Sequence, residues 1–84
     1  MIFKVEIVYG GLDGYRLGTE VDLEEMERML DLLCNRVLKM SEEEINFFEI
    51  EKFIEDAKEF DIDESKATQM SKQRQFNLVI RRLA

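Results

Sequence analysis

The chain opens with an alternation of apolar and charged side chains, and this pattern limits its fold more than any other feature. In residues 2–9, Phe, Val, Ile and Tyr occupy the odd positions while Lys4 and Glu6 stand between them. This period of two is typical of a strand with one buried face. The four glycines of the chain follow at positions 10, 11, 14 and 18. Because glycine tolerates the positive φ angles of tight reversals, residues 10–14 are predicted to connect a β-hairpin with a return strand at about 15–20.

A helix is predicted directly after the hairpin. Asp22 with Glu25 three residues later forms a start that resembles a capping box. Apolar residues then recur at steps of three and four, namely Leu23, Met26, Leu30, Leu33 and Val37. They share one helical face, which is expected to pack on the sheet. Cys34 borders that face and is expected to be a small buried hydrophobe rather than a nucleophile.

A second helix is predicted over 42–60. Ser41 and Glu44 repeat the capping-box pattern and indicate a break near Met40. The predicted core face of this helix consists of Phe47, Ile50, Phe53, Ile54 and Ala57. A strand over 45–50 is the alternative, but two adjacent phenylalanines break strict alternation there and favour the helix.

The last third of the chain is less regular. Residues 61–74 are polar, and Asp63 is a candidate cap for a short helix through Met70. Residues 75–83 fit a strand through Phe76, Leu78 and Ile80, or a helix through Phe76, Val79, Ile80 and Leu83. The strand is favoured because Phe, Val and Ile cluster there and because two strands alone make a marginal sheet. The expected fold is one small α+β domain over 1–84, a ββααβ sandwich with a three-stranded antiparallel-type sheet and two helices on one face.

Composition argues against catalysis and against metal or cofactor binding. The chain has no histidine, which is the commonest general base near neutral pH and the commonest transition-metal ligand. Residues 61–65 begin like a calcium loop, but Lys66 replaces the required glycine and Lys72 stands where the bidentate glutamate belongs. We therefore expect no enzyme, no cofactor and no metal site. A single cysteine, and a start without signal-peptide features, predict a cytoplasmic protein that does not enter a membrane.

The formal net charge of −7 is unevenly distributed. Residues 41–64 carry eleven acids and two bases, whereas 65–84 carry five bases and no acid. On a helical wheel, one stripe of the second predicted helix holds Glu44, Glu51, Glu55 and Glu59. Phe48 falls within this stripe and is the expected aromatic anchor of a partner-binding surface formed by these five residues.

The leading hypothesis is a small acidic protein-binding domain, with solvated surface as the competing interpretation of the stripe. Carboxylates repeating at about 6 Å along a helix match the spacing of phosphates in a nucleic-acid strand, so such a face can occupy a basic cleft that otherwise holds DNA or RNA. In size and composition, with no shared motif, the chain is similar to small acidic inhibitors made by phages and mobile elements. The expected partner is thus a protein with a basic surface, and the expected action is that of a nucleic-acid mimic.

Two alternative functions rest on other parts of the chain. A nucleic-acid-associated regulatory domain would use the basic C-terminal segment, with Lys72, Arg74, Arg81 and Arg82 as contacts. Against this, the sequence pI of about 4.6 lies far below that of usual nucleic-acid binders. A structural homodimer or complex subunit would pair through the outer face of the sheet, which is expected to carry Val8 and Val79.

Overall fold

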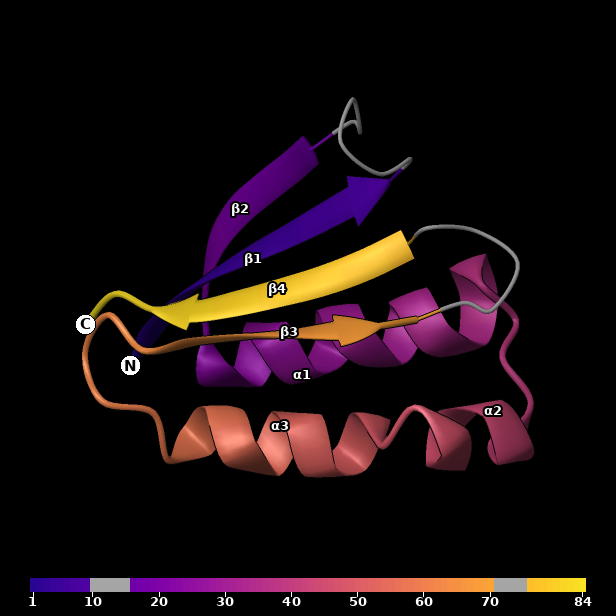
Figure 1. Cartoon of the computed structure of the whole chain (residues 1–84). Helices are drawn as coiled ribbons and strands as arrows, with labels where there is room; N and C mark the ends of the chain where they lie inside the picture. The colour runs from indigo at the N-terminus through magenta and orange to yellow at the C-terminus, as the bar shows by residue number, and fades with distance from the viewer. Residues whose placement is uncertain (10–15, 71–75) are drawn as a thin grey trace.

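Four antiparallel strands, with helices on one face of the sheet, form the fold of the computed structural model, which describes residues 1–9, 16–70 and 76–84 (Figure 1). The strands are β1 (Ile2–Tyr9), β2 (Arg16–Asp22), β3 (Ser65–Gln69) and β4 (Phe76–Arg82). The helices are α1 (Leu23–Leu32), which continues into the π-helical segment η2 (Leu33–Val37), then α2 (Glu42–Phe47) and α3 (Ile50–Lys58). The open sheet has the order β2-β1-β4-β3. The predicted α+β class is confirmed, but the sheet has one strand more than expected.

The alternating first strand lies at the centre of the sheet. Phe3 and Val5 are buried on the helical side, while Lys4 and Glu6 lie on the opposite face. β1 pairs with β2 from Ile2↔Asp22 to Val8↔Arg16, so the predicted hairpin pairing is confirmed, although the connecting residues 10–15 lie outside the described residues. β4 flanks β1 on its other side, as its alternating pattern predicts, and buries Phe76, Leu78 and Ile80.

The strand that sequence analysis missed is β3. The short helix predicted between Asp63 and Met70 is wrong, because residues 65–69 pair in antiparallel register with β4. Asp63 instead has a φ of 70° in the turn before the strand, and its N–H donates to the Arg82 carbonyl at 2.8 Å. β3 is an edge strand whose own residues are mostly exposed; only Met70, just after it, is fully buried. An edge strand of this kind lacks the apolar alternation by which strands are predicted.

The first helix starts as predicted but changes its geometry near its end. The Asp22 side chain accepts a hydrogen bond from the Glu25 N–H at 2.8 Å, which confirms the cap. From Leu33 onward the helix is wider, with the Leu38 N–H bonded to the Leu33 carbonyl five residues earlier. Val37 lies in this wider segment and lines an apolar groove together with Leu30 and Leu33. It is 68% exposed, so its predicted place in the core is wrong.

The second helix is interrupted, so the predicted continuous helix over 42–60 is wrong. Glu49 adopts left-handed geometry with a φ of 53°, which interrupts the helix between α2 and α3. In an unbroken helix, Ile45 and Phe48 would face nearly opposite to the apolar stripe of α3. With the break, both pack against the core. Phe47 does not belong to that core: it is 63% exposed, contrary to its predicted burial.

The core lies between the sheet and the helical layer. Its fully buried large side chains are Phe3, Met26, Leu30, Met70, Leu78 and Ile80. The described part of the chain buries no polar or charged residue. None of the helices in this part is long and apolar enough to cross a bilayer.

Candidate functional site

The net charge of the chain belongs to its helical layer. Residues 23–60, which contain all the helices, carry twelve acids and five bases, whereas the rest of the sequence carries seven of each. The first set has a net charge of −7, and the second is neutral. Because the helices lie on one side of the sheet (Figure 1), one face of the domain is strongly acidic. The acidic residues of the helical layer therefore extend beyond the predicted stripe.

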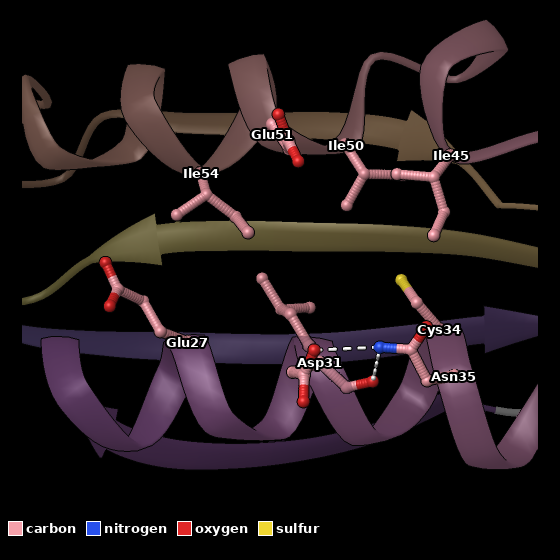
Figure 2. Close-up of a pocket in the computed structure, with 9 residues that line it drawn as sticks. Glu27, Asp31, Cys34, Asn35, Ile45, Ile50, Glu51 and Ile54 are labelled. Atoms are coloured by element: carbon pink, nitrogen blue, oxygen red, sulfur yellow. Dashed lines mark hydrogen bonds between the residues drawn. The ribbon is translucent and has the colours of Figure 1, made fainter. Parts of the chain in front are cut away.

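A groove of about 360 Å³ lies between α1 and the α2–α3 pair (Figure 2). Its apolar lining consists of Leu30, Cys34, Ile45, Ile50 and Ile54. Carboxylates stand on both walls: Glu27 and Asp31 come from α1, and Glu51 comes from α3. The groove thus combines an apolar floor with acidic walls.

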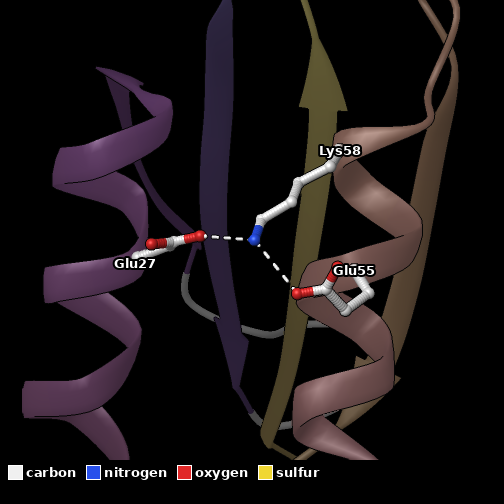
Figure 3. A network of polar contacts seen from close by, with 3 residues as sticks. All are labelled: Glu27, Glu55 and Lys58. Atoms are coloured by element: carbon white, nitrogen blue, oxygen red, sulfur yellow. Dashed lines mark hydrogen bonds and ion pairs between the residues drawn. The ribbon is translucent and has the colours of Figure 1, made fainter.

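Lys58 joins the two walls at one end of the groove (Figure 3). Its Nζ atom lies 2.9 Å from Glu27 Oε1 on α1 and 3.0 Å from Glu55 Oε1 on its own helix. The hydrogen bond to Glu27, followed by that to Glu55, raises the pKa of Lys58. This contact shows that an ammonium group can bridge carboxylates of both helices.

One helical turn further along the groove, each wall carries another carboxylate, Asp31 on α1 and Glu51 on α3. Asp31 lies four residues after Glu27 on α1, and Glu51 lies four residues before Glu55 on the oppositely directed α3. Asp31 Oδ1 accepts a hydrogen bond from Asn35 Nδ2 at 2.8 Å. Neither Asp31 nor Glu51 forms an ion pair with a described residue. These two carboxylates are therefore available to pair with a cation of another molecule.

Sequence analysis placed the acidic site on one helix and missed the contribution of the other. Glu27 and Asp31 carry a usable signal, because their spacing of four places them together beside the apolar face of α1, close to Cys34. That spacing shows which side of the helix they occupy. Only the tertiary arrangement shows that this side faces α3.

The four predicted partner-binding glutamates occupy two different settings. Glu51, Glu55 and Glu59 remain along α3 and its C-terminal cap. Glu44 is separated from them by the break and forms a true capping box with Ser41, its N–H 3.1 Å from Ser41 Oγ.

The predicted anchor is also differently placed. Phe48 packs partly buried against the core rather than standing exposed among carboxylates. Phe47, whose ring meets that of Phe48 edge-on at 5.0 Å between centroids, is 63% exposed and is the one exposed aromatic side chain among those that the structure describes.

The basic C-terminal segment is not gathered into one surface. Arg81 lies beside Lys4 on the outer sheet face, while Arg82 lies on the helical side and donates to the Phe60 carbonyl at 2.7 Å. Lys72 and Arg74 lie outside the described residues. Lys66 bonds Asp56 at 2.6 Å and holds the pKa of that carboxyl below its usual value. Within the described ranges, this is the one ion pair from residues 65–84 to the helical layer, and Glu51, Glu55 and Glu59 take no part in it.

Cys34 is placed as expected, in the apolar floor of the groove with 3% of its surface exposed. Burial, and secondarily the charge of Asp31, raises the pKa of its thiol. A raised pKa keeps the thiol protonated and poorly nucleophilic at neutral pH. Across the residues that the structure describes, no three or more His, Cys, Asp or Glu side chains are grouped to hold a metal ion. Cys34 therefore contributes apolar surface to the floor of the groove.

The Lys58 bridge predicts a pH effect on stability. A folded-state pKa above the unfolded value of about 10.4 means that the contribution is complete below that pH and is lost as pH rises through the folded pKa. We expect Lys58→Met to be less stable than the native protein at pH 8, with the difference shrinking above about pH 10.5. Urea unfolding at both pH values measures this. Lys52→Met, which removes an exposed lysine of the same helix, serves as control, and a difference that stays constant with pH would contradict the assignment.

Three comparisons with known proteins found no relative of this chain. No protein-family model, no curated protein and no solved structure matches the chain. The function is therefore argued from the charge and shape of the site.

Proposed function

We propose that this domain binds a partner protein by presenting its acidic helical layer to a basic surface, of the kind that otherwise holds nucleic acid. The observation that carries the proposal is the partition of charge. Residues 23–60 account for the whole net charge of −7, and the remainder is neutral. A face of one sign steers association toward a surface of the opposite sign and disfavours other orientations.

Two rows of carboxylates support the comparison with a nucleic acid. Glu51 and Glu55 repeat at a spacing of four on α3, and Glu27 and Asp31 repeat at the same spacing on α1. Four residues of helix rise by about 6 Å, which is close to the spacing of phosphates along a strand. A basic cleft that accepts phosphates can pair with such rows. The domain would then exclude nucleic acid from that cleft and act as an inhibitor.

Affinity capture tests this function. The immobilised domain is expected to retain basic, nucleic-acid-binding proteins from a cell lysate treated with nuclease, as identified by mass spectrometry. Raising the salt from about 0.1 to 0.5 M should release them, since salt screens exposed charges, and added DNA or RNA should displace them by competition. Captured proteins that withstand both salt and nucleic acid would argue against the proposal.

A further inference from the structure

The groove between α1 and the α2–α3 pair has an apolar floor, which binding through charge alone would not need. Ile45 and Ile54 are partly buried there, above the buried Leu30, Cys34 and Ile50. We propose that this groove receives an amphipathic helix of the partner protein, with an apolar stripe on the floor and lysines or arginines against the acidic walls. This inference rests on the proposed function and specifies the element of the partner that the acidic layer binds.

The position of the partner's cation follows from Lys58. Its ammonium lies between Glu27 of α1 and Glu55 of α3 at 2.9 and 3.0 Å. One helical turn along the groove, Asp31 and Glu51 line the same two walls (Figure 2). A lysine or arginine of the partner placed there would repeat the internal bridge. Charge complementarity therefore selects a basic segment over an acidic or neutral one.

The surroundings of the groove favour a helix over an extended peptide. The backbone groups of α1 and α3 are largely engaged within their own helices, so the floor offers mainly apolar side chains. An extended peptide pressed onto such a floor would leave its own N–H and C=O groups without partners, which is costly. A helix satisfies these groups internally and presents side chains at steps of three and four. Its pitch of about 5.4 Å is close to the rise of about 6 Å between successive wall carboxylates.

A synthetic peptide of about 18 residues tests the inference directly. The probe carries leucines at helical i, i+3, i+4 and i+7 spacing, flanked by lysines, and its binding to the whole domain is measured by fluorescence anisotropy at about 0.1 M salt. Two matched peptides replace the leucines with serines or the lysines with glutamates. We expect the leucine–lysine peptide to bind at least tenfold more tightly than the serine–lysine peptide, and the leucine–glutamate peptide not to bind.

Three domain variants locate the site without disturbing the core. Asp31→Asn with Glu51→Gln removes the open pair of wall charges, and Asn35→Lys places a competing cation four residues from Asp31. Each is expected to weaken the leucine–lysine peptide about tenfold, because exposed charge pairs contribute modestly. Glu20→Gln with Asp61→Asn removes two exposed charges outside the helical layer and is expected to leave binding within twofold. All of these side chains are exposed, and thermal melts confirm that each variant is folded.

The outcomes separate this inference from the proposed function. Equal binding of the leucine–lysine and serine–lysine peptides overturns the groove inference, because the floor would then contribute nothing, while salt-sensitive capture would still uphold charge presentation. If the groove variants and the control variant weaken peptide binding equally, the groove is not the binding site. Failure of the native domain to bind the leucine–lysine peptide also overturns the inference, and the capture experiment separately decides the proposed function.

Discussion

Phe53→Ala is expected to lower the free energy of unfolding by about 3–5 kcal/mol, whereas Phe47→Ala is expected to lower it by less than about 1 kcal/mol. Phe53 is 2% exposed within the core, and Phe47 is 63% exposed. The larger loss combines the lost transfer of the ring from water with the cavity left behind. It is a large share of the roughly 4–13 kcal/mol expected for a domain of this length. Urea unfolding followed by circular dichroism measures both variants.

A graded substitution guards against complete unfolding of the alanine variant. Phe53→Leu keeps most of the volume and is expected to cost roughly 1–2 kcal/mol. If Phe47→Ala proved as destabilising as Phe53→Ala, the break between α2 and α3 would be refuted, because a continuous helix would place both rings on its core face.

The two central strands could be predicted because their buried residues alternate with more exposed ones along the sequence. Phe3 and Val5 in β1, and Leu78 and Ile80 in β4, are buried at alternate positions. That alternation is visible in one dimension. β3 could not be found in this way because its residues are mostly exposed. Its strand geometry depends on pairing with β4, a long-range contact that no local pattern records.

The break in the second helix had a signal that the prediction left unused. Ile45 and Phe48 are apolar, yet in a helix that ran on, Phe48 would lie about 140° around the axis from Phe53, and Ile45 would lie outside the apolar stripe of α3. A continuous helix would have left both side chains exposed to water, so a break between them and Phe53 was the alternative. Its position remained hidden because Glu49, not glycine, adopts the left-handed geometry there.

The candidate site was predictable in charge but not in shape. The carboxylates of α3 were identified from composition and spacing, since both are properties of the sequence. The α1 wall, formed by Glu27 and Asp31, depends on how the two helices lie on the sheet. Helix orientation is set by packing of the whole core rather than by either helix.

The second large effect concerns partner binding. Replacing Glu51, Glu55 and Glu59 together with lysine changes the net charge from −7 to −1 and makes the α3 wall basic. We expect capture of the partner to fall at least a hundredfold, because like charges across an interface add repulsion to the lost attraction. All three side chains are exposed, so the fold should persist, as a thermal melt will show.

The most direct test of charge presentation compares this variant with one that has the same net charge but an intact helical layer. Glu20→Lys, Asp61→Lys and Glu64→Lys also change the charge by six, at exposed positions outside residues 23–60. The measurement is the dissociation constant of each variant for the captured partner at about 0.1 M salt. The acidic-layer account predicts that the α3 reversal loses binding at least a hundredfold while the control changes it less than tenfold. Equal binding by the α3 variant and the native domain, or equal losses in both variants, would contradict it.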